Sequence, residues 1–145
     1  MKLVIQRVSS ASVRVNNELV SEIKQGLLVL IGVSPKDTSE NIDWLVNKLI
    51  NLRIFEDDNG KMNLSVQDIN GEIMLISQFT LYANCEKGRR PSFIEAGEPE
   101  MANRLYEEFC AKVQTSFKEP RKGIFGADMK IALVNDGPVT IILEK

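Results

Sequence analysis

A short polar segment at the end of an apolar run is the first place where this sequence could support chemistry. Ser77, Gln78, Phe79 and Thr80 follow the apolar residues 74–76 directly. Hydroxyls and backbone N–H groups at a strand end can hold a carbonyl under attack, because donors aimed at the developing oxyanion stabilise it. The same pattern also allows Gln78 and Thr80 to face solvent or to bond across a sheet. The pattern leaves both interpretations open.

The residues that most hydrolases use are missing. The 145 residues include no histidine and only two cysteines, Cys85 and Cys110. This composition excludes a Ser-His-Asp triad, a Cys-His pair and a histidine-based zinc site. The two cysteines lack metal-ligand spacing, and Asp57-Asp58 lacks the alternating ligands of a calcium loop. We therefore expect no metal and no cofactor, so proton transfers must come from other groups or from the substrate.

A second candidate segment contains glycine and proline side by side. Gly137 and Pro138 lie within residues 135–140, Asn-Asp-Gly-Pro-Val-Thr, between two apolar runs. Such a pair usually forms a turn. An X-Pro bond can also be cis at a cost of only about 0.5–1 kcal/mol. Because Gly137 has no side chain, the dipeptide could then aim two carbonyl oxygens in one direction. Both interpretations stay open at this point.

Positive charge is concentrated in a chain whose net charge is −2. The slight acidity argues against a general nucleic-acid binder, which would carry a broad basic field. Lys87, Arg89 and Arg90 nevertheless form a basic loop, and residues 118–122 form a looser basic group before Phe125. Charge runs of this kind are often only solvated surface. Two basic groups near an aromatic residue also suit a phosphate backbone with a stacked terminal base.

The elements that position these segments are mostly strands. Apolar runs and turn residues predict strands at 2–8, 11–15, 19–23, 26–33, 73–81, 130–134 and 139–143. The continuous apolar run at 26–33 indicates a strand that is buried on both faces. Asn16-Asn17 predicts a tight turn, because asparagine tolerates positive φ.

Two helices are expected. The first begins at Asp37 or Thr38, with Glu40 placed for a capping box. Its apolar stripe consists of Ile42, Leu45, Val46, Leu49 and Ile50. The second begins at Pro99, and its stripe consists of Met101, Leu105, Phe109 and Val113. Cys110 lies beside that stripe, where we expect it to be buried and inert.

The order of these elements predicts one α+β domain over residues 1–145, with a curled, barrel-like mixed β-sheet and two main helices. The first residues turn polar too soon for a signal peptide, and no apolar run approaches a membrane span. We therefore expect a cytoplasmic protein without a membrane anchor.

Taken together, the segments resemble the D-aminoacyl-tRNA deacylase family, also called D-tyrosyl-tRNA deacylase. Its first motif, Ser-Gln-Phe-Thr-Leu, is similar to residues 77–81, and its second, Asn-x-Gly-Pro-Val-Thr, to residues 135–140. Residues 87–93, 125–129 and 4–8 also fit the family in order and spacing. Asn17 and Lys130 depart from common family residues, and both lie outside the motifs.

The resemblance implies an enzyme that hydrolyses the ester of D-aminoacyl-tRNA and spares L-aminoacyl-tRNA. It implies a homodimer in which the first motif of one subunit holds the aminoacylated 3′ end of tRNA. Gly137 and Pro138 of the other subunit, joined by a cis bond and braced by Arg7, enter that pocket and exclude L-amino acids. The same exclusion would leave glycyl-tRNA a substrate. Phe125 is expected near the terminal adenosine.

Within this mechanism the catalytic segment is Ser77, Gln78, Phe79 and Thr80. An aminoacyl ester is already activated and lies beside a ribose hydroxyl, so positioning with oxyanion stabilisation could suffice without histidine. We assign the backbone N–H groups of Phe79 and Thr80 to the oxyanion and regard the Thr80 hydroxyl as a positioning group, because the sequence shows no base to activate it.

Two other functions compete with this one. The first is a non-catalytic RNA-binding β-barrel in which the motifs are structural. Its slight acidity and lack of interleaved aromatic residues argue against it. The second is a small-molecule hydrolase with Thr80 or Cys110 as the nucleophile.

Overall fold

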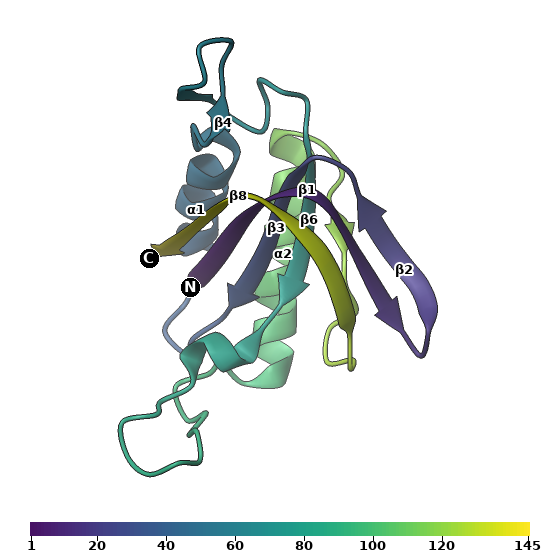
Figure 1. Cartoon of the computed structure of the whole chain (residues 1–145). Helices are drawn as coiled ribbons and strands as arrows, with labels where there is room; N and C mark the ends of the chain where they lie inside the picture. Colours follow the sequence, from purple (N-terminus) through teal and green to yellow (C-terminus); the bar gives the residue numbers. More distant parts are fainter.

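A curved six-stranded sheet carries both main helices in the computed structural model, which describes residues 1–145 (Figure 1). The strands are β1 Lys2–Val15, β2 Glu18–Ile23, β3 Gly26–Gly32, β4 Phe55–Glu56, β5 Met62–Leu64, β6 Glu72–Ser77, β7 Arg121–Lys122 and β8 Lys130–Glu144. The helices are α1 Ser39–Asn51, the 3-10 helix η1 Phe79–Tyr82 and α2 Pro99–Ser116. The α+β class and the curled mixed sheet predicted from the sequence are confirmed.

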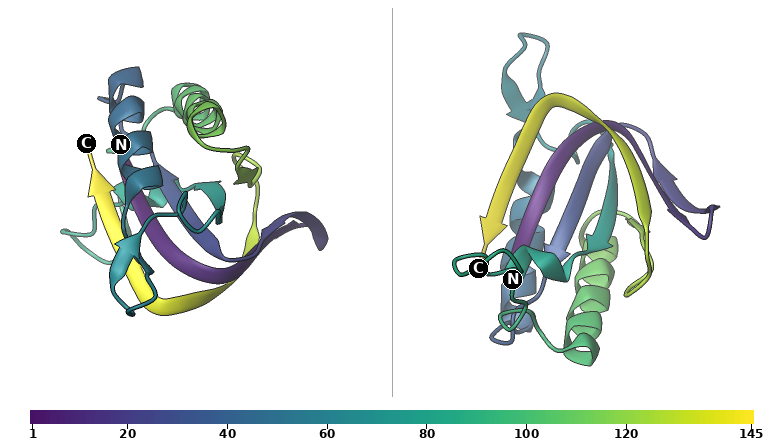
Figure 2. Two further views of the ribbon diagram at one scale, coloured as in Figure 1. Left: turned by 90° about the horizontal axis from the view of Figure 1, so that it is seen from above. Right: turned by 60° about the horizontal axis from the view of Figure 1, so that its bottom comes forward.

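The long strand β1 organises the sheet. Its first half pairs with β3 and its second half with β2, both antiparallel and along the same edge. Strand β8 pairs antiparallel with the other edge of β1 over nearly its whole length. Beyond β3 the order continues through β6 and β7, both parallel. Figure 2 shows β1 and β8 curving together around the helices. The sheet therefore ends in an unpaired edge along β8.

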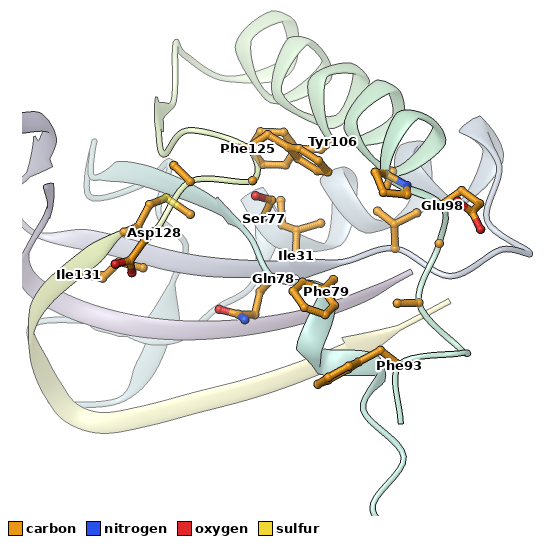
Figure 3. Close-up of a pocket in the computed structure, with 18 residues that line it drawn as sticks. Ile31, Ser77, Gln78, Phe79, Phe93, Glu98, Tyr106, Phe125, Asp128 and Ile131 are labelled. Atoms are coloured by element: carbon orange, nitrogen blue, oxygen red, sulfur yellow. The ribbon is translucent and has the colours of Figure 1, made fainter. Parts of the chain in front are cut away.

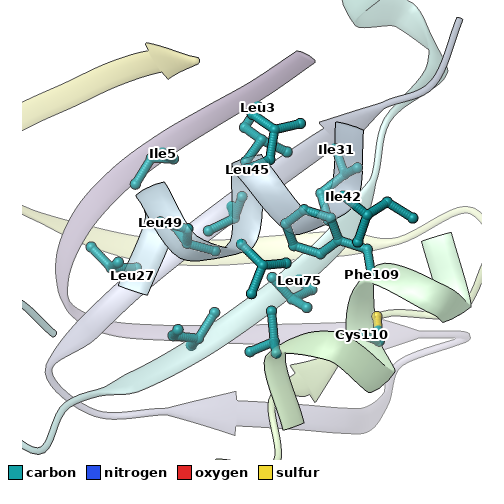
Figure 4. Close-up of a cluster of buried hydrophobic side chains, with 14 of the residues drawn as sticks. Leu3, Ile5, Leu27, Ile31, Ile42, Leu45, Leu49, Leu75, Phe109 and Cys110 are labelled. Atoms are coloured by element: carbon teal, nitrogen blue, oxygen red, sulfur yellow. The ribbon is translucent and has the colours of Figure 1, made fainter. Parts of the chain in front are cut away.

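Strands β3 and β6 are buried on both faces, and the apolar run at 26–33 predicted this for β3. Leu27 and Leu75 point into the larger core cluster, which includes side chains of α1 and α2 (Figure 4). Leu28 and Met74, one position along each strand, point into a smaller cluster on the opposite face. Alternate side chains leave a strand on opposite faces, so a strand between two cores must be apolar at every position.

Both helices begin where the sequence predicted and bury the predicted stripes, except that Met101 at the start of α2 is only partly buried. Pro99 is the first residue of α2, and Thr38 precedes α1 as its N-cap. The expected capping partner was wrong: the Thr38 N–H donates to Asn41 Oδ1 at 2.8 Å, so Asn41 replaces Glu40. The cap lies one residue later than Asp37, which moves the third helical position to Asn41.

Three strand boundaries differ from those expected. Residues 2–15 form one strand, because β8 bridges the polar pair Ser9-Ser10 with a shifted register. The strand expected at 73–81 ends at Ser77, where η1 begins. Residues 130–144 form one strand rather than two, with the glycine–proline pair inside it. No helix combines the length and the apolar character needed to cross a membrane.

Candidate functional site

A pocket of about 650 Å³ opens between the end of β6, the start of α2 and the segment before β8. Its lining includes three of the four residues proposed to be catalytic, Ser77, Gln78 and Phe79, together with Phe125 (Figure 3). The structure thus brings the first motif and the proposed adenosine-binding aromatic, 46 to 48 positions apart in the chain, to one cavity. Most of the remaining lining is apolar.

The first motif leaves the sheet at this pocket. The Gln78 N–H donates to the Ile31 carbonyl at 2.7 Å as the last ladder bond, and the chain then tightens into η1. Gly32 allows η1 to pack closely on β3, because a Cβ there would lie 2.9 Å from Leu81 Cβ and 3.2 Å from the Tyr82 ring. Residues 79–82 therefore do not continue the strand that the sequence predicted at 73–81.

Two features of η1 bear on chemistry. The backbone N–H groups of Phe79 and Thr80 are the first in the 3-10 turn, and neither has an acceptor within it. The Gln78 Nε2 donates to Thr80 Oγ1 at 2.6 Å, so the two polar side chains are held together. Phe79 and Thr80 are exposed, and Gln78 is partly buried. No acidic or basic side chain bonds to the Thr80 hydroxyl.

Aromatic rings line the pocket in two pairs (Figure 3). Tyr106 of α2 lies 6.1 Å from Phe125 between ring centroids, tilted by 45°. Its hydroxyl donates to the Leu75 carbonyl at 2.8 Å, which ties α2 to β6 beneath the pocket, and burial raises its pKa. Phe93 packs edge-on against Phe79 with centroids 5.0 Å apart. The sequence patterns indicated no site role for Tyr106 or Phe93, because an aromatic residue on a helix stripe or in a loop is usually packing.

The second motif forms a bulge in β8 that is not part of this pocket. Gln6 pairs with Thr140 and Val8 with Asn135, so that the four residues 136–139 lie opposite Arg7 alone. The peptide bond from Gly137 to Pro138 is cis, as expected, and Gly137 has φ +127°. Within one chain, neither Gly137 nor Pro138 lines the cavity that holds Gln78 and Phe79.

Arg7 is a buried cation that holds this bulge. Its Nε donates to the Asp136 carbonyl at 3.0 Å and lies 3.3 Å from the Asp136 carboxylate. Its Nη1 donates to the Ile54 carbonyl at 2.6 Å, and Nη2 lies 3.9 Å from Glu56. A buried guanidinium persists only when its donors are satisfied in this way. Arg7 therefore fastens the residue before Gly137 to the chain that follows α1.

The predicted basic loop lies beside the pocket rather than in it. Lys87, Arg89 and Arg90 are exposed, and none forms an ion pair within the chain. Two lysines of the second basic group, residues 118–122, already have partners within the chain. Lys118 bonds to Asn70, and Lys122 pairs with Glu107 at 2.8 Å, which raises the pKa of the lysine.

The rival nucleophile Cys110 is poorly suited to its role. Its side chain is buried in the larger core between α2 and the sheet, and burial raises its pKa to about 12. A thiol that stays protonated and shielded from solvent does not attack esters. No three acidic or cysteine side chains converge as a metal site would require. Independence of metal stays a prediction.

Comparison with known proteins places the whole chain in one group. The family model for D-Tyr-tRNA(Tyr) deacylase matches residues 4–144. Proteins named D-aminoacyl-tRNA deacylase from Flavobacterium psychrophilum and Geotalea daltonii are 57% identical over 145 residues and 58% over 144. The alignments cover 99% of this chain in both cases, and 97% and 96% of the relatives.

Two solved structures share the fold. One, titled c-Myc DNA Unwinding Element Binding Protein, is 42% identical with a TM-score of 0.95, over 100% of this chain and 99% of that one. The other, titled as a structural analysis of a probable eukaryotic D-amino acid tRNA deacylase, is 20% identical with a TM-score of 0.83, over 98% and 97%. With the family model matching nearly every residue, this chain belongs to the D-Tyr-tRNA(Tyr) deacylase family.

Proposed function

We propose that this protein hydrolyses the ester bond of D-aminoacyl-tRNA and releases the free D-amino acid and tRNA. The observation that carries the proposal is the pocket that gathers Ser77, Gln78 and Phe79 with Phe125, in a chain whose full-length relatives bear the name of this activity. The proposed setting is the cytoplasm, where charged tRNA is used.

The chemistry rests on positioning and oxyanion stabilisation. The backbone N–H groups of Phe79 and Thr80, without acceptors in their own turn, donate to the oxygen that becomes negative when water attacks the ester carbonyl. The neighbouring ribose hydroxyl of the substrate orients that water and assists its deprotonation. The ester C–O bond then breaks, and the ribose oxygen leaves with a proton. No histidine is needed for this sequence of steps.

The Thr80 hydroxyl acts as a positioning group in this mechanism. Its only side-chain partner is the Gln78 amide, which donates to it at 2.6 Å and cannot accept its proton as a base would. A threonine nucleophile requires a base within hydrogen-bond reach. Thr80 instead fixes the Gln78 side chain at the pocket wall, where both limit the positions open to the ester.

Chirality is enforced by the Gly137–Pro138 bulge of a second copy of the chain. The bulge lies outside the pocket of its own chain, so it can act on a bound amino acid only across an interface. Strand β8 offers that interface, because its outer edge is unpaired and Val134 and Ile142 are exposed along it. Arg7 holds the bulge in place through its bonds to Asp136.

A series of three substrates tests this function. Carbonyl oxygens of the bulge would clash with the side chain of an L-amino acid, while a D-amino acid and glycine present hydrogen there. We expect cleavage of D-alanyl-tRNA and glycyl-tRNA and resistance of L-alanyl-tRNA. Glycyl-tRNA as resistant as the L form would show that the site recognises a D side chain positively. Sedimentation of the same preparation should give a homodimer.

The rival function is nucleic-acid binding without catalysis. One observation favours this rival: the solved structure titled c-Myc DNA Unwinding Element Binding Protein is 42% identical to this chain. A preparation that binds uncharged nucleic acid but leaves D-alanyl-tRNA intact would support this rival. Release of D-alanine at a rate that rises in proportion to protein concentration would exclude it.

A further inference from the structure

The rings of Phe79 and Phe93 form a second aromatic pair at the pocket mouth and have no role in the proposed function, which uses only the backbone N–H of Phe79. Phe93 packs edge-on against Phe79, with ring centroids 5.0 Å apart and planes at 68°. Both residues are exposed, Phe93 by 40% and Phe79 by 56%, and the next residue, Ile94, is 88% exposed. Large apolar side chains exposed side by side at a pocket mouth indicate a contact surface.

Backbone hydrogen bonds hold Phe93 in place without any ligand. Asn84 and Ser92 exchange two bonds, of 2.8 and 2.9 Å, directly before Phe93. Shortly after it, the Gly97 N–H donates to the Val33 carbonyl at 2.8 Å at the end of β3. The backbone that carries Phe93 is therefore anchored on both sides along the chain. A surface fixed in advance loses little conformational entropy when it binds.

Free positive charge lies next to this ring. The bonds between Asn84 and Ser92 close a loop over residues 85–91 that carries Lys87, Arg89 and Arg90. Figure 1 shows this loop extending from the same end of the molecule as η1. No carboxylate of the chain pairs with these three cations, although Glu86 lies within the loop. An aromatic platform beside unpaired cations is the arrangement that single-stranded nucleic acid requires.

We propose that Phe93, supported by Phe79, stacks the base of the nucleotide that precedes the terminal adenosine. This inference rests on the proposed function, which assigns the ester to the N–H groups of Phe79 and Thr80, and on the expectation that the terminal adenosine lies near Phe125. Figure 3 shows the two aromatic pairs at separate places around the pocket, which gives consecutive bases separate platforms. The phosphates of the emerging strand then pass the loop with Arg89 and Arg90.

The test compares ligands that differ by one nucleotide. The full-length protein and its Phe93→Leu and Phe93→Tyr variants are titrated with adenosine and with the dinucleotide cytidylyl-adenosine. Leucine keeps an apolar side chain but removes the stacking face, whereas tyrosine retains it. Loss of one base–aromatic stack weakens binding roughly 5- to 150-fold. We expect that loss for Phe93→Leu with the dinucleotide only, and wild-type behaviour for Phe93→Tyr.

The corresponding D-alanyl esters give a second measurement. For Phe93→Leu, kcat/KM should fall by the same factor on D-alanyl-cytidylyl-adenosine and stay unchanged on D-alanyl-adenosine. An equal fall on both esters would show that Phe93 acts through Phe79, and unchanged affinity for the dinucleotide would show that it binds no base. Either result overturns the proposal. Failure of the wild-type protein to cleave either ester would instead refute the proposed function, and the titrations would still decide the role of Phe93.

Discussion

Gly137→Ala tests whether the β8 bulge depends on the absence of a side chain. A Cβ at this position would lie 2.8 Å from Val139 Cγ2, 2.9 Å from the Val139 backbone nitrogen and 3.2 Å from Arg7 Nη2. Backbone at 2.9 Å cannot yield as a flexible side-chain end can. The φ of +127° is also one that residues with a Cβ rarely adopt.

The loss of stability in Gly137→Ala has two sources, the strained backbone and the crowding by the added Cβ. Backbone strain at positive φ costs about 1–3 kcal/mol, and overpacking costs about 1–3 kcal/mol more. Gly60→Ala is the matched control, because Gly60 has φ +71° but nothing within 4 Å of its added Cβ. The control carries the smaller backbone strain of a φ close to the left-handed region, and no overpacking. We therefore expect Gly137→Ala to lower the free energy of unfolding by about 2 kcal/mol more than Gly60→Ala.

Urea unfolding measures this difference, with fluorescence of the single tryptophan, Trp44, as the probe. At a slope of about 2 kcal/mol per M, the midpoint of Gly137→Ala should lie about 1 M below that of Gly60→Ala. Protomer concentration must be equal in both titrations, because the stability of a dimer depends on it. Equal midpoints would refute the steric argument.

Deacylation rates of the same two variants test the functional part. A displacement of about 1 Å in a positioning element can lower a rate roughly a hundredfold. Gly137→Ala should therefore lose activity on D-alanyl- and glycyl-tRNA alike, whereas Gly60→Ala should match the unsubstituted protein. Unchanged deacylation rates of Gly137→Ala would show that the bulge is not part of the active site.

The remaining predictions concern the basic loop, the first motif, the thiols and metal. Arg89→Ala with Arg90→Ala should weaken tRNA binding and reduce the slope of log affinity against log salt by about 1.5, since each phosphate contact contributes about 0.7–0.9. An unchanged slope would place the loop outside the RNA interface. Thr80→Val should lower kcat by about tenfold to a hundredfold, less than the roughly thousandfold upper range for a lost oxyanion donor, and a trapped aminoacyl-Thr80 ester would contradict its positioning role. At pH 8 iodoacetamide should alkylate the exposed Cys85 and spare the buried Cys110. The pKa of Cys110, raised to about 12 by burial, keeps its thiol protonated at pH 8. Equal labelling of the two would show that the core opens. Chelators should leave deacylation unchanged, and complete loss restored by a transition metal would contradict this.

The local patterns that the sequence predicted correctly share a physical cause. A strand between two cores must be apolar at every position, so the run at 26–33 identified β3 without any knowledge of its neighbours. Helix stripes and the proline at the start of α2 are likewise properties of one segment. Predictions failed where a distant partner decides the outcome. Strand β8 is continuous through its glycine–proline pair because β1, more than a hundred residues away, pairs with both of its halves.

The candidate site divides in the same way. Residue types alone excluded histidine-based catalysis and a histidine-based zinc site. They also identified Ser77 to Thr80 as an unusual polar segment after an apolar strand. Only the tertiary structure decided that Tyr106 and Phe93 line the same pocket as that segment, and that Arg7 lies opposite the bulge at 136–139. The periodicity of a sequence specifies which face of an element is buried. The register between elements, and hence which side chains meet, is set by packing across the whole chain.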